Sequence, residues 1–159
     1  MVNSGAPDSL ALDGTGRRFG IVAARFHGAI VDRLLAGAEA ALRTHGVAPA
    51  DIRVVRVPGA WEIPAGLDAL ARSGEYSALV ALGVLIRGGT MHFEVIADQC
   101  SRGIAEVALR RELPVTFGVL TCETMEQAEA RAGGAEGNKG EEAALAALEM
   151  AILVARLRT

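Results

Sequence analysis

Short apolar runs alternate with segments of helical periodicity along nearly the whole chain, and this alternation restricts the fold more than any other feature. The apolar runs have the length and composition of buried strands and cover residues 19–24, 52–57, 77–86 and 114–120. Helices are predicted over residues 28–45, 64–73, 93–112, 124–132 and 141–157. The pattern predicts an α/β fold, a three-layer sandwich whose four-stranded parallel sheet carries helices on both faces. Whether the N-terminal arm adds one further strand is left open.

Length and charge narrow the class of protein. We expect an N-terminal arm over residues 1–16 and a single domain over residues 17–159. A formal net charge of −3 argues against a nucleic-acid partner, because phosphate backbones require a concentrated basic surface. No apolar run approaches the roughly 20 residues that span a bilayer, and residues 1–16 lack the features of a secretory signal. We therefore expect no membrane partner and a cytoplasmic location.

Cysteine and histidine usage gives no indication of a metal site. The two cysteines, Cys100 and Cys122, form no CxxC motif, so free thiols in a reducing cytosol are expected. No cluster of cysteine and histidine has the spacing of metal ligands, and no metal is expected.

The most distinctive local feature lies at residues 83–93 (GVLIRGGTMHF), where an apolar run ends in glycines, a threonine and a histidine. Gly88 and Gly89 let backbone N–H groups approach a ligand closely, and Thr90 adds a hydroxyl. His92 can transfer protons near neutral pH. The segment is typical of a small-anion site with an acid–base group beside it. The ordinary alternative is a glycine turn followed by a solvated histidine at a helix start.

Other unusual side chains fall in loops at the same predicted edge of the sheet. In open α/β sheets, ligands bind at the carboxyl ends of the strands. Phe26 lies in a loop, where it either packs on a neighbour or stacks on a planar ligand. Glu62 is either an acid favoured by a helix N-terminus or a carboxylate that binds hydroxyls. Trp61 beside it is more often a packing or interface residue than a ligand contact.

Two cations near the C-terminus have competing explanations. Arg131 follows a short helix, where it either interacts with the helix dipole or binds an anion. Lys139 precedes the last helix, where a cation opposes the dipole and so requires an anion or an acidic neighbour. Glu94 and Asp98 lie on the helix of His92 and either orient it or are solvated.

Together these segments resemble those of the 6,7-dimethyl-8-ribityllumazine synthase family, from about residue 12 to residue 157. Five segments match in order and spacing, and the combination is specific although no single segment is. They are ARFH at 24–27, VPGAWEIP at 57–64, GVLIRGGTMHF at 83–93, FGVLT at 117–121, and EQA, RAG and GNKG between 126 and 140.

The resemblance implies an enzyme of riboflavin biosynthesis that needs neither a metal nor an organic cofactor. It would condense 5-amino-6-(D-ribitylamino)uracil with 3,4-dihydroxy-2-butanone 4-phosphate through an imine, with loss of phosphate and water. The residue types suit such substrates, since a pyrimidine favours a stacking ring, a ribityl chain favours hydroxyl acceptors, and proton transfer favours a group that titrates near neutrality.

The resemblance also implies roles for individual residues on the pyrimidine side. Phe26 would stack on the pyrimidine, Glu62 would accept hydrogen bonds from ribityl hydroxyls, and His92 would donate and shuttle protons. Two further residues would line the uracil and ribityl side, namely Ala60 and Trp61. Backbone groups would meet the heterocycle at three strand positions, namely Val84, Leu85 and Ile86.

On the phosphate side, the resemblance implies a site shared between subunits. Gly89 and Thr90 of one subunit would contact the substrate phosphate. Phe117 and Arg131 match positions that the family supplies from the neighbouring subunit, with Arg131 on the phosphate and Lys139 in an electrostatic role nearby. A homo-oligomer is therefore expected, a pentamer or a multiple of it up to an icosahedral shell.

Two departures from the family pattern and two competing functions stay open. Trp61 is bulky where the family varies among apolar residues, and Glu94 replaces a shorter acid. One alternative is a non-catalytic flavin- or lumazine-binding or shell-forming protein of the same fold. The other is an unrelated phosphate-binding α/β enzyme such as a sugar-phosphate isomerase, which would leave Phe26 and Glu62 unexplained.

Overall fold

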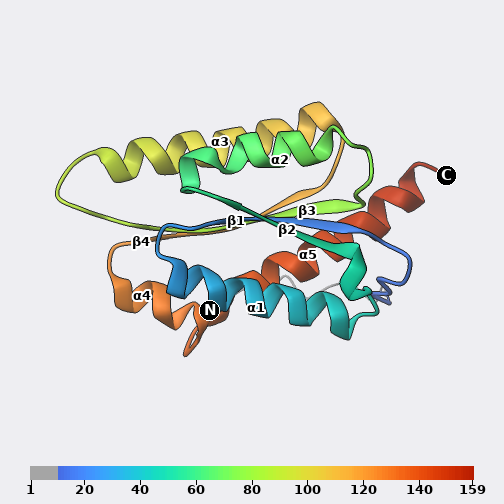
Figure 1. The fold of residues 1–159 in the computed structure, drawn as a ribbon, viewed down its shortest axis with the longest axis horizontal. Coiled ribbons are helices and arrows are strands. Elements are labelled where there is room, and N and C mark those ends of the chain that lie inside the picture. Colours follow the sequence, from blue (N-terminus) through green and yellow to red (C-terminus); the bar gives the residue numbers. More distant parts are fainter. Residues whose placement is uncertain (1–10) are drawn as a thin grey trace.

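A four-stranded parallel sheet forms the middle layer of the molecule (Figure 1). The structure is a computed structural model that describes residues 11–159. The sheet order is β2-β1-β3-β4, and every neighbouring pair is parallel. The strands are β1 (Phe19–Ala24), β2 (Ile52–Val57), β3 (Ala78–Ile86) and β4 (Val115–Cys122). The predicted four-stranded α/β sandwich is confirmed.

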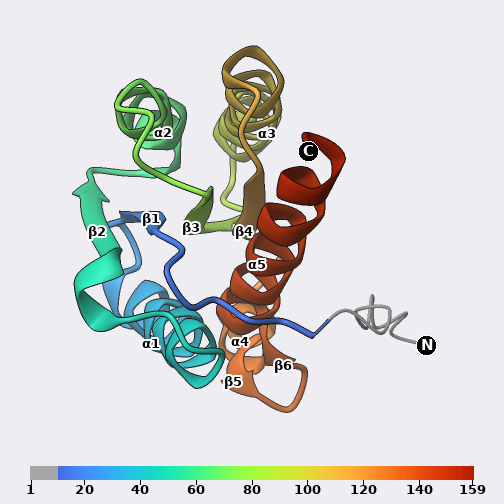
Figure 2. The same cartoon turned by 90° about the vertical axis from the view of Figure 1, so that its right-hand side faces the viewer.

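Helices cover both faces of this sheet, as the end-on view in Figure 2 shows. One face carries α2 (Ile63–Ala71) and α3 (His92–Arg111), and the other carries α1 (Gly28–Thr44) and α5 (Lys139–Leu157). The short helix α4 (Met125–Ala130) lies on the α1 and α5 side. Parallel strands need crossover connections, and α1, α2 and α3 are the crossovers, whereas α4 and α5 follow the last strand.

The apolar strands are explained by burial on both faces. Phe19 and Ile21 of β1 pack in the core under α1 and α5, whereas Val22 packs in the core under α2. Adjacent residues of a strand point to opposite faces, so a strand covered on both sides has no polar face. This is why β1 is a continuous apolar run without polar alternation.

Helices α1 and α5 pack very closely, and one glycine permits it. A Cβ at Gly140 would lie 2.0 Å from the carbonyl oxygen of Leu34, a distance that no side chain can occupy. Asn138 fixes the start of α5, because its Oδ1 accepts from the backbone N–H groups of Gly140 and Glu141 at 2.8 and 3.1 Å. Its Nδ2 donates to the carbonyl of Arg33 in α1 at 3.1 Å, which ties the two helices together.

The structure differs from the prediction mainly at the ends of elements. The glycine-rich segment between the last two predicted helices holds a small hairpin of β5 (Ala132–Gly134) and β6 (Gly137–Asn138). Two short 3₁₀ helices were also not predicted, η1 (Pro49–Asp51) and η2 (Ala60–Glu62). Lys139 begins α5 instead of preceding it, because Asn138 supplies the cap. Thr124 caps α4, with its Oγ1 accepting from the N–H of Gln127 at 3.2 Å.

Residues 1–10 lie outside the part of the chain that the structure describes. The predicted arm boundary and the optional extra strand therefore stay predictions, although within residues 11–16 the N–H of Gly14 donates to the carbonyl of His45 at 2.7 Å. Among the described residues, no helix combines the length and apolar character needed to cross a membrane.

Candidate active site

The loops that follow the four strands gather at the carboxyl edge of the sheet, on the left-hand side of Figure 1. A cavity of about 660 Å³ lies there between η2, the end of β3 and the first turn of α3. It collects most of the predicted site residues. Those that line it are Phe26, Ala60, Trp61, Glu62, Val84, Leu85, Ile86, Thr90 and His92. We call this space the first cavity.

Two aromatic side chains of the first cavity are largely exposed. Phe26 is 67% exposed and Trp61 is 55% exposed, so neither is a core residue. His27 adopts a left-handed backbone conformation with φ of 56°, which is uncommon for a residue other than glycine and begins α1 directly after Phe26. The Phe26 ring meets the His27 ring edge-on at 4.7 Å, and the Phe26 N–H donates to the carbonyl of Pro58 at 3.1 Å. The exposed position of Phe26 is therefore held by the β1–α1 loop.

Glu62 has a structural contact as well as a place in the first cavity. Its Oε2 accepts from the backbone N–H of Gly59 at 3.0 Å and so closes the turn that begins η2. One oxygen of Glu62 therefore has an ordinary structural role at the start of a helix. The same carboxylate lines the cavity, where an acceptor of hydroxyl groups is useful.

The backbone at the end of β3 lacks a strand neighbour on one side. The pairing of β3 with β4 runs to Ile86 and Cys122, whereas the pairing with β1 ends at Leu82 and Ala23. Residues 84–86 therefore extend past β1, and all three line the first cavity. Backbone donors and acceptors at a strand end of this kind are suited to recognising a planar ligand edge.

The glycine loop at residues 87–91 connects β3 to α3. A Cβ at Gly88 or Gly89 would meet nothing within 4 Å, and neither residue has a positive φ. The chain's own packing and backbone conformation therefore do not require these glycines. The N–H of His92, the first residue of α3, lies 3.4 Å from Thr90 Oγ1, to which it donates.

Neither acid near His92 serves to orient it. Glu94 forms an ion pair with Arg87, and Asp98 accepts from Arg102 Nε at 3.1 Å. Of the two roles considered for these acids, orienting His92 or being solvated, these contacts favour the solvated position, where each acid pairs with an arginine.

A second cavity of about 600 Å³ runs along the open edge of β4 toward α5. It collects the three remaining charged or aromatic site residues, namely Phe117, Arg131 and Lys139. Phe117 is 47% exposed on this edge strand. Arg131 donates from one guanidinium nitrogen to the carbonyl of Gln127 at 3.0 Å, and Lys139 Nζ lies 2.7 Å from a Glu142 oxygen. The acidic neighbour that Lys139 required is therefore Glu142.

Cys122 also lines the second cavity, but its environment does not favour a nucleophile. Burial raises the pKa of the thiol, and the nearby Arg131 only partly opposes that shift. A raised pKa leaves less thiolate at neutral pH. Within residues 11–159, no three metal-binding side chains of histidine, cysteine, aspartate or glutamate gather at one point.

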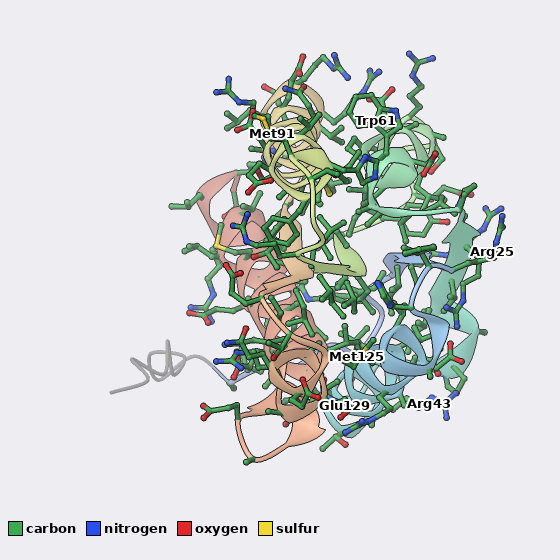
Figure 3. All side chains as sticks on the ribbon, turned by 90° about the vertical axis from the view of Figure 1, so that its left-hand side faces the viewer. Arg25, Arg43, Trp61, Met91, Met125 and Glu129 are labelled. Carbon is green, nitrogen blue, oxygen red and sulfur yellow. The ribbon has the colours of Figure 1, made fainter. Side chains whose placement is uncertain are left out.

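The two cavities share no lining residue within the described part of the chain. In Figure 3, Trp61 and Met91 lie on the α2 and α3 side, whereas Met125 and Glu129 lie with α4 on the opposite side. The chain thus collects an exposed aromatic ring, part of the glycine loop and the histidine in one cavity and two cations in another. Gly89 lines neither cavity, although its neighbours Gly88 and Thr90 line the first.

Comparison with known proteins decides the family. The sequence profile of 6,7-dimethyl-8-ribityllumazine synthase matches residues 16–155. The 6,7-dimethyl-8-ribityllumazine synthase of Aquifex aeolicus (strain VF5) is 53% identical over 147 residues, which cover 92% of this chain and 96% of that protein. The chain belongs to the 6,7-dimethyl-8-ribityllumazine synthase family. A synthase of the same name from Anaeromyxobacter sp. (strain Fw109-5) is 52% identical over 89% of this chain and 86% of its own.

Family membership confirms the resemblance predicted from the five segments. It also confirms the assignment of the chain as a transferase-type enzyme of riboflavin biosynthesis.

Several residues of the first cavity were not singled out from the sequence. His27 and Phe93 line it beside residues that were selected. Their adjacency to Phe26 and His92 was the available signal. Arg87 lies outside this set, and its ion pairs gave no signal in the sequence, because the carboxylates that bind it lie 7 and 36 positions further along the chain.

Proposed function

We propose that this chain condenses 5-amino-6-(D-ribitylamino)uracil with 3,4-dihydroxy-2-butanone 4-phosphate to form 6,7-dimethyl-8-ribityllumazine. One observation carries the proposal beyond family membership. An exposed aromatic ring, a carboxylate, a glycine–threonine loop and a histidine line one cavity of about 660 Å³. Each of these groups matches a different part of the two substrates.

The pyrimidine side is assigned to Phe26 and the end of β3. The ring of Phe26 stacks on the heterocycle, since most of its surface is uncovered in the chain. The backbone of Val84, Leu85 and Ile86 hydrogen-bonds the heterocycle edge, because these residues extend beyond the pairing with β1. Ala60 and Trp61 line the ribityl side, where one oxygen of Glu62 accepts hydrogen bonds from the hydroxyls while the other holds the start of η2.

The phosphate side is assigned to the glycine loop. Gly88 and Gly89 have open space where a Cβ would project, and this space lets a phosphate approach the backbone N–H groups. Thr90 adds its hydroxyl, and the N-terminus of α3 begins two residues later. The dipole of this long helix favours negative charge at that point.

His92 serves as the proton donor and shuttle. It lines the first cavity at the first turn of α3, close to the phosphate loop in sequence and in space. The amine of the pyrimidine forms an imine with the ketone and releases water, phosphate leaves, and the ribityl-bearing nitrogen closes the second ring with loss of water. A group that exchanges protons near neutral pH accelerates each of these proton transfers.

The remaining residues complete the site of a neighbouring subunit. Phe117, Arg131 and Lys139 line a cavity that shares no residue with the first, and the exposed Phe117 ring lies on an unpaired sheet edge. In a head-to-tail ring, the second cavity of one subunit closes the first cavity of the next. Arg131 then binds the phosphate, with Lys139 in support. The assembly is a pentamer or a multiple of it, its partners are the two small substrates, and its location is the cytoplasm.

The test is turnover by the purified protein. Mixing it with both substrates should produce the fluorescent lumazine faster than the spontaneous reaction does, and light scattering should report a pentamer or a multiple of it. A rate equal to the uncatalysed control would overturn the catalytic proposal. Tight flavin binding without turnover would favour the non-catalytic alternative, and a monomer with full activity would overturn the shared site.

A further inference from the structure

Arg87 lies at the base of the glycine loop and makes more charged contacts than any residue around it. It is the first residue after β3, and its backbone N–H donates to the carbonyl of Cys122 at 2.9 Å. Its guanidinium forms an ion pair with Glu94 in the first turn of α3. It also donates from Nε to Glu123 Oε2, at 2.8 Å, in the loop between β4 and α4. The guanidinium carbon lies 4.7 Å from the ring centre of Phe93.

These contacts close the glycine loop at both of its ends. The loop leaves β3 at Arg87 and enters α3 at His92, and the partners Phe93 and Glu94 follow immediately. Gly88 and Gly89 give the loop wide conformational freedom, which opposes the precise placement of N–H groups around an anion. The contacts of Arg87 restrict the conformations of the loop because they fix the residues at its beginning and at its end.

The same contacts exclude a direct electrostatic role for Arg87. Two carboxylates flank the guanidinium, so the group of three carries a formal charge of −1 and offers no surplus positive charge to a phosphate. Arg131 differs, because its recorded partner within the described residues is a neutral carbonyl. The cation that contacts the anion and the cation that shapes the loop are therefore different residues.

The contacts are also poor candidates for a purely stabilising role. The side chains of Arg87, Glu94 and Glu123 are 38%, 45% and 60% exposed. Exposed ion pairs of this kind contribute little to the free energy of unfolding. Their value lies in geometry, because the fork of an arginine binds two carboxylates in fixed directions, which a lysine cannot reproduce.

We propose that Arg87 is a positioning residue that sets the conformation of the phosphate loop by joining β3, the first turn of α3 and the β4–α4 loop. The proposal rests on the proposed function in that it takes residues 88–90 to be the phosphate-binding segment. The predicted loss on removing Arg87 falls mainly on the phosphate substrate. Phe26 and Glu62 belong to other loops, and residues 84–86 are held by the pairing of β3 with β4.

The test compares three single substitutions, each made in the otherwise wild-type chain and measured in its assembled form. They are Arg87→Gln, Glu94→Gln and the control Arg102→Gln. Arg102 pairs with Asp98 on the same helix and lies outside both cavities. Arg87→Gln should raise the KM of the phosphate substrate at least about tenfold, since small misplacements of binding groups have large effects. The KM of the pyrimidine should change less than about twofold, and the thermal midpoint should fall by less than about 4 °C.

Glu94→Gln separates positioning from charge by the sign of its effect. Removing a negative charge beside the loop would tighten phosphate binding if charge alone mattered. Under the proposal it weakens phosphate binding, because Arg87 loses one anchor. Isothermal titration calorimetry with inorganic phosphate measures this without turnover, and Arg102→Gln should match the wild type in every measurement.

The proposal is overturned by a Glu94→Gln protein that binds phosphate more tightly, by equal changes in both KM values, or by an Arg102→Gln protein that behaves like Arg87→Gln. A wild-type protein that binds no phosphate overturns it too. A wild-type protein that binds phosphate but forms no lumazine overturns the proposed function alone. Arg87→Lys should resemble Arg87→Gln, and full phosphate affinity in Arg87→Lys would contradict the need for the forked guanidinium.

Discussion

The two cavities at the carboxyl edge differ in the chemistry that they hold. The first cavity contains Phe26, Glu62 and His92, to which the proposed function assigns stacking, hydroxyl recognition and proton transfer. The second contains the cation Arg131 and the ion pair of Lys139 with Glu142. Neither set alone fits a reaction that joins a heterocycle to a sugar phosphate. The difference supports the proposal that one chain carries two complementary halves of a site, as a ring of identical subunits with shared active sites requires.

The largest loss of activity is expected from a substitution in the first cavity. His92→Ala should lower kcat by about 100-fold or more, as is typical when a general acid–base group is removed. The oligomer seen by light scattering should be unchanged, because His92 is an exposed residue at the start of α3. Steady-state kinetics would measure the loss, and an unchanged kcat would remove His92 from its proposed role.

A substitution in the second cavity is expected to have a smaller effect, on substrate affinity instead of on the rate of proton transfer. Arg131→Gln should raise the KM of the phosphate substrate at least about 10-fold, because hydrogen bonds to charged groups contribute about 1.5–3 kcal/mol and about 1.4 kcal/mol corresponds to a factor of ten. The pyrimidine KM should stay near its wild-type value. A matched change at Arg156, which lies far along α5, should leave both KM values unaltered. If Arg131→Gln changed kcat but neither KM, the assignment of the cation to the phosphate would be wrong.

Mixed assemblies test whether the two halves belong to different chains. Co-refolding equal amounts of His92→Ala and Arg131→Gln chains should place an intact His92 opposite an intact Arg131 at about a quarter of the interfaces in a head-to-tail ring. The kcat/KM of the mixture should then rise well above the mean of the two separate preparations. Activity equal to that mean would show that each chain completes its own site.

The smallest effect on activity is expected at Asp68, which lies away from both cavities. Its carboxylate accepts from Arg111 at 2.7 and 3.1 Å and from Arg110 at 3.2 Å, and it lies 3.2 Å from Arg72, so it joins α2 to α3. Asp68→Asn should leave both KM values unchanged and lower the thermal midpoint by about 2–4 °C. An effect on either KM would show that the two regions are not independent.

The contribution of Asp68 to the stability of the folded state depends on pH in a definite direction. Its hydrogen bonds with Arg111 lower its pKa from 3.8 to about 2, with a smaller contribution from Arg110. A carboxyl whose pKa is lowered by folding stabilises the folded state above its unfolded pKa, and this contribution disappears as the pH falls toward the folded value. The stability difference between wild type and Asp68→Asn should therefore be constant at neutral pH and vanish between pH 4 and about 2. Acid titration of unfolding would measure it.

Much of the fold could be predicted from the sequence because strands that are buried on both faces consist of apolar residues. The continuous apolar runs predicted β1 and β3 correctly, since strands covered on both faces have no polar positions. Element ends were less accurate, because Asn138 and Glu62 form local caps that depend on contacts with the backbone. The hairpin of β5 and β6 lies in a segment of glycines with no apolar pattern, so periodicity could not predict it.

The sequence by itself determined the parallel α/β class, the family and the identity of the candidate groups, because these depend on residue types in a fixed order. Tertiary structure decided how the groups are divided. Phe26, Glu62 and His92 meet only because parallel strands end at one edge, and Arg131 is directed to another cavity because α4 follows the edge strand β4. The role of Arg87 was also invisible in the sequence, since its partner Glu123 lies 36 positions away and is brought to it by the pairing of β3 with β4.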